Sequence, residues 1–113
     1  MDIVSDHIGD ALVARVRESR IDAAVAIRFK DRMREVLADP GAAARVVLDL
    51  SQVDFLDSSG LGAVVAVMKM TGQGRNLELA GLTPTVEKVF RLTRMDRVFT
   101  IHPAAPEGVQ NVG

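Results

Sequence analysis

The chain has no cysteine, no long hydrophobic run and almost no net charge. Without cysteine it can form no disulfide, no thiolate metal site and no cysteine nucleophile. Its longest apolar stretch, residues 61–68, is far shorter than the roughly 20 residues of a membrane-spanning helix. The formal net charge of -1 argues against nucleic-acid binding, which depends on neutralising phosphates. The acidic N-terminus lacks the basic and apolar regions of a signal peptide. We therefore expect a cytoplasmic protein with no nucleic-acid partner and no membrane insertion.

What remains is the composition of a soluble globular protein. The 113 residues are 48% hydrophobic and 26% charged, and this length suits one domain with a buried core. The sequence contains no internal repeat and no sign of a second domain. Apolar residues become sparse after residue 102, where Pro103 and Pro106 occur. We expect a domain over residues 1–102 and a flexible tail over residues 103–113.

The first half of the chain predicts a hairpin, a helix and a strand. Residues 3–8 and 12–17 are expected to form two strands joined at Gly9-Asp10, because two faces of different polarity alternate in the second. Asp22 is a suitable N-cap for a helix of about 15 residues. The apolar positions of that helix recur at steps of three and four. Residues 45–50 are nearly all apolar, which is typical of a parallel strand covered on both faces.

The second half alternates helices and strands. An almost wholly apolar helix is expected over residues 58–71, and it must be buried or face a partner. A strand at 77–80, a helix opened by Thr83 and Pro84, and a short closing strand at 98–101 follow. This order predicts an α/β fold with a mixed, mostly parallel sheet of about five strands and three or more helices.

The most informative segment is DFLDSSGLGA, residues 54–63, which connects the buried strand to the apolar helix. It places Ser58 and Ser59 at a helix start, where the first amide groups lack partners and favour oxygen atoms and anions. Ser58 is therefore either a helix cap or a switch. Gly60 and Gly62 either admit a partner's backbone close to that hydroxyl or allow tight packing of the helix on the sheet. The residues alone leave both choices open.

Three other features carry less information. The segment GQGR at 72–75 lacks the lysine and Ser/Thr of a phosphate-binding loop and is interpreted as a turn. His7 and His102 lie far apart in the sequence without ligand clusters, so no metal site is expected. The arginines near the third helix form either a surface for an acidic partner or a solvated face. They are Arg91, Arg94 and Arg97.

With this order of elements and the turn DSSGLG at residues 57–62, the chain resembles the STAS domain family. More narrowly, it resembles the single-domain bacterial anti-sigma factor antagonists. The similarity covers residues 3–101, and the other blocks that carry it are Ile21-Asp22, the strand at 46–50 and the segment LTPTVEKVFRLT at 82–93. The family often has a glycine after its third helix, where this chain has Thr93-Arg94-Met95.

The resemblance implies a regulatory binding protein, not an enzyme, that works by partner switching without a cofactor. The unphosphorylated form would bind an anti-sigma factor that is also a serine kinase, and so free a sigma factor. Phosphorylation of Ser58 by that kinase would block binding, and a serine phosphatase would restore it. The oligomeric state stays open. The residues implied in partner binding are Asp22, Asp57, Ser59, Gly60, Leu61 and Gly62.

Other functions have less support in the sequence. STAS-type domains also serve as cytoplasmic subunits of lipid transporters and in stress-sensing assemblies, which is the alternative within the same fold. A serine hydrolase using Ser58 is disfavoured, because there is no Gly-x-Ser-x-Gly elbow and neither histidine has the context of a catalytic triad. Nucleotide binding has no motif behind it.

Overall fold

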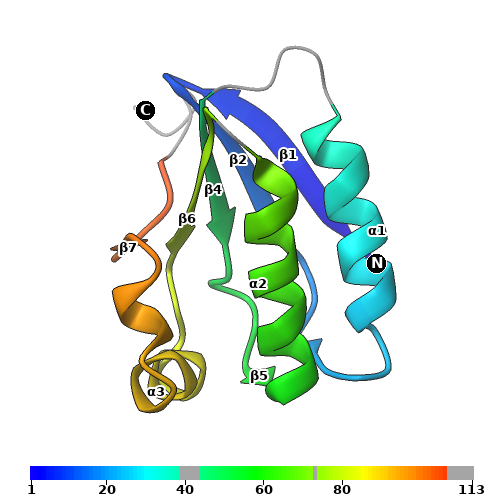
Figure 1. Cartoon of the computed structure of the whole chain (residues 1–113), viewed down its shortest axis with the longest axis vertical. Helices are drawn as coiled ribbons and strands as arrows, with labels where there is room; N and C mark the ends of the chain where they lie inside the picture. The colour runs from blue at the N-terminus through cyan, green and yellow to red at the C-terminus, as the bar shows by residue number, and fades with distance from the viewer. Residues whose placement is uncertain (39–43, 73, 107–113) are drawn as a thin grey trace.

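A five-stranded sheet forms the centre of the computed structural model, which describes residues 1–38, 44–72 and 74–106. Its strands, in their order across the sheet, are β1 (Ile3–Ile8), β2 (Ala11–Val16), β4 (Arg45–Asp49), β6 (Asn76–Ala80) and β7 (Ile101–His102) (Figure 1). β1 pairs antiparallel with β2, and the other three pairs of neighbours are parallel. The predicted mixed, mostly parallel sheet of five strands is confirmed.

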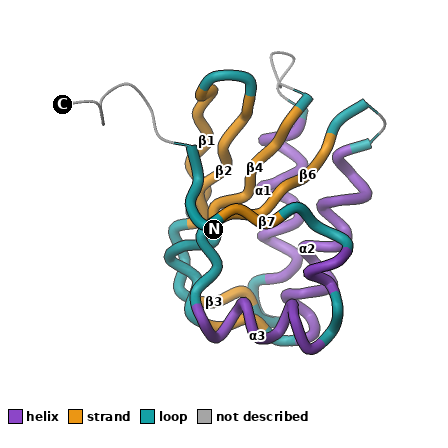
Figure 2. Tube along the Cα trace, turned by 90° about the vertical axis from the view of Figure 1, so that its left-hand side faces the viewer, coloured by secondary structure: helices purple, strands orange, loops and turns teal. Residues whose placement is uncertain are grey.

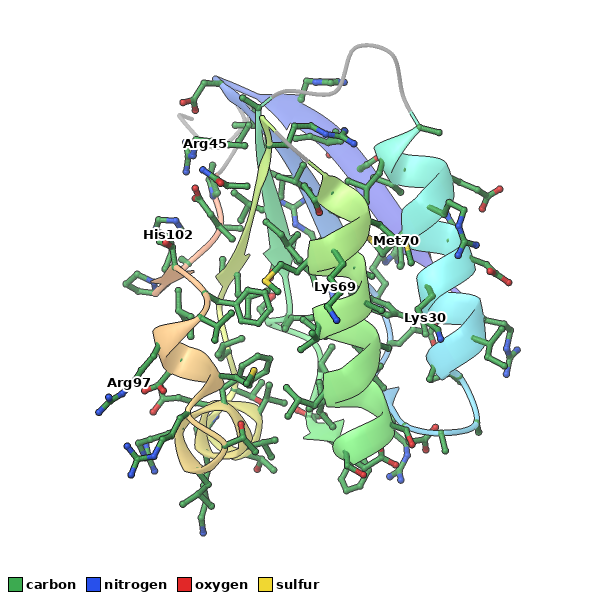
Figure 3. The ribbon with its side chains drawn as sticks, in the orientation of Figure 1. Lys30, Arg45, Lys69, Met70, Arg97 and His102 are labelled. Atoms are coloured by element: carbon green, nitrogen blue, oxygen red, sulfur yellow. The ribbon has the colours of Figure 1, made fainter. Side chains whose placement is uncertain are left out.

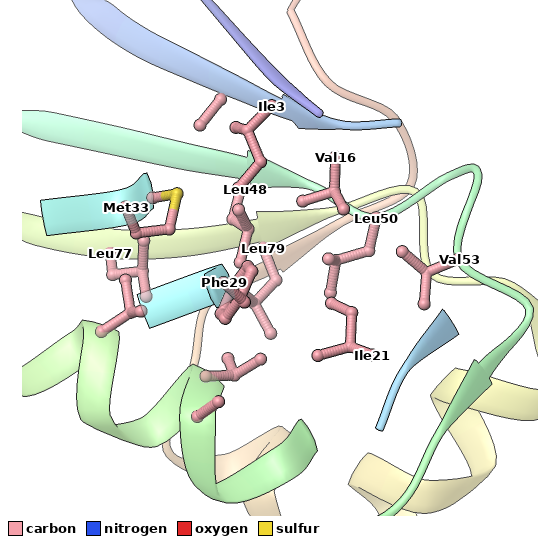
Figure 4. Packing of buried hydrophobic residues seen from close by; sticks show 14 of the residues in the cluster. Ile3, Val16, Ile21, Phe29, Met33, Leu48, Leu50, Val53, Leu77 and Leu79 are labelled. Atoms are coloured by element: carbon pink, nitrogen blue, oxygen red, sulfur yellow. The ribbon is translucent and has the colours of Figure 1, made fainter. Parts of the chain in front are cut away.

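Two helices, α1 (Ala26–Leu37) and α2 (Ser58–Thr71), lie side by side on one face of this sheet (Figure 2). The apolar stripe predicted for α1 is buried there, and Phe29 and Met33 are fully enclosed. Leu48 of the sheet and Phe29 of α1 belong to the same buried cluster (Figure 4). The helix predicted at 58–71 is confirmed at both ends, and its apolar side chains are buried or half-buried.

The helix α3 (Pro84–Leu92) and the short 3-10 helix η1 (Met95–Arg97) lie at the end of the sheet where the parallel strands finish. Thr83 and Pro84 open α3 as predicted. The ring of Phe90 meets that of Phe99 edge to face, with centroids 5.9 Å apart, and so anchors this region to the core.

The closing strand begins at Ile101, three residues later than the sequence predicts. The amides of Val98 and Phe99 both donate to the carbonyl oxygen of Met95, at 3.0 and 3.2 Å. These two residues are therefore held in the turn of η1 and cannot join the sheet. Backbone pairing with β6 starts only at Thr100, whose carbonyl oxygen accepts from the amide of Leu79 at 2.9 Å.

The first helix begins at Ala26, so the prediction that Asp22 is its N-cap is wrong. Val25 occupies the cap position, and its side chain makes no capping hydrogen bond. The carboxylate of Asp22 instead accepts from the amide of Ala24 at 3.1 Å, which closes a local turn before the helix starts. The helix accordingly has 12 residues and is shorter than expected.

A second, two-stranded sheet lies next to the start of α2. β3 (Arg20–Ile21) pairs in parallel with β5 (Phe55–Leu56). The amides of Asp54 and Phe55 both donate to the carbonyl oxygen of Ser19, at 2.8 and 3.2 Å. Strands of two residues are too short to show a periodicity, so the sequence did not predict this pair. Its consequence is to hold the segment after β2 beside the segment that leads into α2.

The other face of the central sheet, within the described residues, is closed without a helix. A small apolar cluster is buried there, and the half-buried Ala105 packs against it. The strand β4 is thus covered on both faces, as predicted. Of the expected tail, residues 107–113 lie outside the described residues. The buried members of this cluster are Ala11, Val13, Val47 and Ala80.

Ion pairs surround this cluster. The Nε of Arg15 lies 3.1 Å from a carboxylate oxygen of the buried Asp49. Arg45 lies 2.9 Å from Glu78 and 2.7 Å from Asp10. These charged side chains cover the apolar cluster on this face. Because they are paired, covering it costs less desolvation free energy than it would with unpaired charges.

Candidate functional site

The turn that leads into α2 is capped by Asp57. Its carboxylate oxygen Oδ1 accepts a hydrogen bond from the amide of Gly60 at 2.8 Å, and its carbonyl oxygen accepts from the amide of Leu61 at 2.8 Å. Ser58 is the first residue within the helix and its side chain is exposed. The interpretation of Ser58 as the helix cap is therefore wrong. Its hydroxyl has no capping role in this fold.

The same carboxylate joins two segments that are distant in sequence. Oδ2 of Asp57 accepts from the amide of Ala23 at 3.3 Å, in the turn that precedes α1. Asp22, in that turn, accepts from Ala24 and also from the Nε of Arg20 at 3.2 Å. The structure thus brings the predicted site residues Asp22, Asp57 and Ser58 to one end of the molecule.

The two glycines of the turn have different surroundings. Gly60 is buried, and a Cβ built on it would overlap the carbonyl oxygen of Ile21 in β3. Gly60 therefore serves the close approach of α2 to β3. Gly62 is exposed, and a Cβ there would meet nothing within 4 Å. Packing within the described residues therefore does not explain a glycine at position 62. The other interpretation, that it allows a partner to approach closely, stays open.

The two other predicted partner-binding residues are both accessible, but to different degrees. Ser59 is exposed beside Ser58, whereas Leu61 is half-buried and packs against the main core. Ser59 is therefore more accessible to a partner than Leu61.

One feature of the site was missed by the sequence analysis. The guanidinium carbon of Arg20 lies 4.3 Å above the ring centroid of Phe55, a cation–π arrangement. Phe55 keeps 38% of its surface exposed, three residues before Ser58. No periodic signal marks Phe55 in the sequence, because the buried Val53 and Leu56 are three residues apart and both residues between them are exposed. An exposed aromatic ring beside a polar turn is a common contact residue in protein interfaces.

Three further predictions can be compared with the described residues. Among the described residues, no group of three or more His, Cys, Asp and Glu side chains is placed to hold a metal ion. No described helix is both long and apolar enough to cross a membrane. The turn expected at 72–75 includes residue 73, which lies outside the described residues, while Gly72 and Gly74 flank it with φ values of 78° and 80°.

The family model of the STAS domain matches residues 2–107, nearly the whole chain. The chain belongs to the STAS domain family. It is 31% identical over 105 residues to the anti-sigma-F factor antagonist RsfB of Mycobacterium tuberculosis, and this alignment covers 89% of the present chain and 83% of RsfB. The resemblance drawn from the sequence is thus confirmed.

Solved structures agree with this assignment. The crystal structure of an anti-sigma factor antagonist from Mycobacterium paratuberculosis matches with a TM-score of 0.79 and 25% identity, over 91% of this chain and 86% of that one. The Bacillus cell fate determinant SpoIIAA, solved in its phosphorylated form, shares the fold at 17% identity with a TM-score of 0.62. That match covers 98% of this STAS domain and 96% of SpoIIAA.

Proposed function

We propose that this STAS domain protein is an anti-sigma factor antagonist that works by partner switching. Its unphosphorylated form binds an anti-sigma factor that is also a serine kinase, and the sigma factor is released. Phosphorylation of Ser58 by that kinase ends the binding, and a serine phosphatase restores it. The observation that carries the proposal is the position of Ser58. It is the first residue of α2, its side chain is exposed, and Asp57 rather than Ser58 caps the helix.

The start of α2 can accept a phosphate without rearrangement. A phosphoserine carries about -1.5 to -2 charges at neutral pH, and helix N-termini favour anions through their free amides and dipole. Asp54 and Asp57 repel this charge, but Ser58 is exposed, so solvent screens the repulsion. Phosphorylation therefore leaves the fold unchanged in this proposal.

The effect of phosphorylation falls on the partner. If Ser58 lies within the interface, its phosphate must be desolvated on binding, at an effective cost of several kcal/mol. Since about 1.4 kcal/mol corresponds to a tenfold change in affinity, the partner binds the phosphorylated form at least about a hundredfold more weakly.

The predicted contact residues have distinct parts in this interface. Ser59 and Gly62 are exposed on α2 and can touch the partner directly. Leu61 adds the accessible part of its side chain. Asp22 belongs to the turn that Asp57 holds against α2, so Asp57 positions one part of the surface relative to the other. Gly60 acts from within, by setting the distance between α2 and β3.

The relatives of this chain support the general role. RsfB is an anti-sigma-F factor antagonist, and the alignment with it covers most of both chains. SpoIIAA, which shares the fold, exists in a phosphorylated form. Both facts concern those proteins, and the role of Ser58 in this chain needs its own test.

The test uses the anti-sigma factor kinases encoded in the source genome, purified one at a time. Each is incubated with radiolabelled ATP and the wild-type chain, Ser58→Ala or Ser59→Ala, and binding is measured by calorimetry without ATP. We expect one kinase to bind the wild type and Ser58→Ala alike, and to label the wild type and Ser59→Ala but not Ser58→Ala. Ser58→Asp should lose binding by about a hundredfold.

Two outcomes would contradict the proposal. One is full binding by Ser58→Asp, and the other is labelling that persists in Ser58→Ala. Isolation of the chain with the subunits of a lipid transporter or with a large stress-sensing assembly, and with no kinase, would favour the alternative role of a STAS subunit.

A further inference from the structure

We propose that the outer surface of α3 and η1 is a second contact for the partner, and that it takes an acidic segment carrying an apolar side chain. We call this surface the α3–η1 patch and define it by its exposed cations and apolar residues. This inference rests on the proposed function, since it concerns the same partner. The patch consists of Lys88, Arg91, Leu92, Arg94, Arg97 and Val98.

The patch is cationic on a molecule that is otherwise acidic. Residues 84–98 contain four basic side chains and two acidic ones, Glu87 and Asp96, which gives this segment a net charge of +2. The whole chain carries -1, so all other residues together carry -3. Positive charge is therefore concentrated in this segment although the whole chain is slightly negative. A negatively charged segment of a partner would be attracted to it.

Most of these cations have no partner of their own. Arg91 lies 3.0 Å from Glu87 in the preceding turn of α3. Lys88, Arg94 and Arg97 make no ion pair with any described residue. Arg97 points away from the sheet into the surroundings (Figure 3). A free guanidinium group can bind a carboxylate through two parallel hydrogen bonds, so arginines suit an acidic segment well.

The backbone at Arg94 is an independent sign that its side chain is used. Arg94 has φ 62° and ψ 17°, and it is the one described residue other than glycine with positive φ. This left-handed conformation favours glycine or asparagine, and an arginine is strained in it. A glycine would relieve the strain, and the Arg94 side chain makes no hydrogen bond or ion pair with a described residue that would be lost. Such strain is often found at functional positions.

Two large apolar side chains accompany the cations. Leu92 is 70% exposed and Val98 is 51% exposed, although the helix and turn that carry them bury Phe90 and Phe99. Exposed apolar groups among charged ones are typical of protein interfaces, where the apolar groups form the centre and the charges the rim. A nucleic acid or a lipid headgroup layer offers uniform negative charge, which Glu87 and Asp96 would oppose. The mixture of charges and apolar groups therefore favours a protein segment.

The helix that carries part of the patch lies close to the segment that leads to Ser58. α3 packs against β5, the strand that leads into the phosphoacceptor turn. The hydroxyl of Thr83, at the start of α3, donates to the carbonyl oxygen of Val53 at 2.7 Å. A partner that covers Ser58 can thus extend onto the α3–η1 patch. This surface would be negative at Asp54 and Asp57, beside Ser58, and positive at the α3–η1 patch. A partner with the complementary charges can bind in one orientation only.

The test measures binding of the anti-sigma factor kinase that labels Ser58 in the wild-type chain. The double variant Lys88→Glu/Arg97→Glu reverses two unpaired cations. We expect about tenfold weaker binding at low salt, with most of the loss abolished at high salt. Lys69→Glu is the matched control: Lys69 is exposed on α2, eleven residues beyond Ser58, and its reversal should leave binding within about twofold.

A second variant separates binding from folding. Arg94→Gly removes one cation and also relieves the strained backbone, so it should raise thermal stability while it weakens binding about threefold. Carbodiimide cross-linking adds a direct readout, because it joins the Lys88 amine to carboxylates that touch it. Peptide mapping should then identify Asp or Glu of the kinase.

The outcomes distinguish this inference from the proposed function. If no kinase binds or labels the wild type, the proposed function fails. If the kinase binds and labels Ser58 but both patch variants bind like Lys69→Glu, the α3–η1 contact is wrong and the proposed function stands. Binding of the wild-type chain, but not the double variant, to vesicles of equal parts phosphatidylglycerol and phosphatidylcholine would overturn the assignment to a protein segment.

Discussion

Gly60, in the first turn of α2, packs directly against the carbonyl group of Ile21 in β3. This contact sets how closely the helix approaches the small β3–β5 sheet. Gly62, two residues later in the same helix, faces open space. The two glycines therefore form a natural pair for separating a structural role from a surface role.

Alanine at these two positions should have opposite effects on stability. Gly60→Ala forces α2 away from β3 and should lower the free energy of unfolding by about 2–4 kcal/mol. Gly62→Ala should leave it unchanged or raise it by up to about 1 kcal/mol, because alanine favours the helix. Urea denaturation followed by circular dichroism measures both. Equal stability of the two variants would show that the helix can shift to accept the extra methyl group.

Removal of the Asp57 carboxylate should loosen both segments that it joins. Asp57→Ala leaves the amides of Gly60 and Ala23 without their acceptor, and we expect a loss of about 1–2 kcal/mol in the free energy of unfolding. Amide hydrogen exchange should become faster at these two residues in particular. Asp54→Ala is the control, since the Asp54 side chain makes no hydrogen bond to a described residue. It should change the free energy of unfolding by less than about 0.5 kcal/mol. Unchanged exchange at Ala23 would contradict the bridging role.

Phosphorylation of Ser58 should change the fold very little. Because Asp57, and not Ser58, caps α2, the added phosphate displaces no hydrogen bond of the helix start. We expect the unfolding free energies of the two forms to agree within about 1 kcal/mol. In NMR spectra, chemical shift changes should be confined to the start of α2 and the neighbouring turns. Changes throughout the central sheet would mean that phosphorylation acts by refolding.

Acid should weaken the sheet face that carries Glu78. Hydrogen bonds from Arg45 hold the pKa of the Glu78 carboxyl below its ordinary value. His102 lowers this pKa further, because its Nε2 lies 2.8 Å from Oε1 of Glu78. A carboxyl with a lowered folded pKa stabilises the fold above its ordinary pKa of 4.5, and this contribution is lost as the pH falls through the lowered value.

The variant Glu78→Gln tests this pH dependence. At neutral pH it should lower the free energy of unfolding by about 1–2 kcal/mol, and the difference from wild type should shrink below pH 4.5. Glu87→Gln is the control, because it removes a glutamate carboxylate that also pairs with an arginine but is exposed. It should lower the free energy of unfolding by less than about 0.5 kcal/mol. Denaturant titrations at neutral and acidic pH provide the comparison. A difference that stays constant on acidification would exclude the ionised form of Glu78 as its source.

The sequence predicted best the elements whose ends carry local signals. The helix at 58–71 has the expected bounds because Asp57 precedes it and Gly72 follows it, and the strand at 3–8 ends at Gly9-Asp10 as expected. The start of α1 was misplaced because an aspartate before an apolar pattern can either cap a helix or close a turn. Which of these occurs at Asp22 depends on Ala24 and on the distant Asp57, and a local pattern does not contain that contact.

For the site, the sequence located the turn but did not show which role each of its residues has. Ser58 and Asp57 are adjacent and both suit an N-cap, so only the hydrogen bond of Gly60 decides between them. Gly60 and Gly62 are likewise equivalent in sequence, and they differ only because β3 passes one of them. The close approach of Gly60 to Ile21 joins segments more than thirty residues apart, so no local pattern records it.

The outer strands of the central sheet bear on how this domain behaves when crowded. β7, at one border, pairs over only two residues, and β1, at the other, carries Asp6 in its interior. Short or charged border strands are poor templates for a strand from another molecule. Both borders of the sheet therefore disfavour edge-to-edge pairing between copies of this domain.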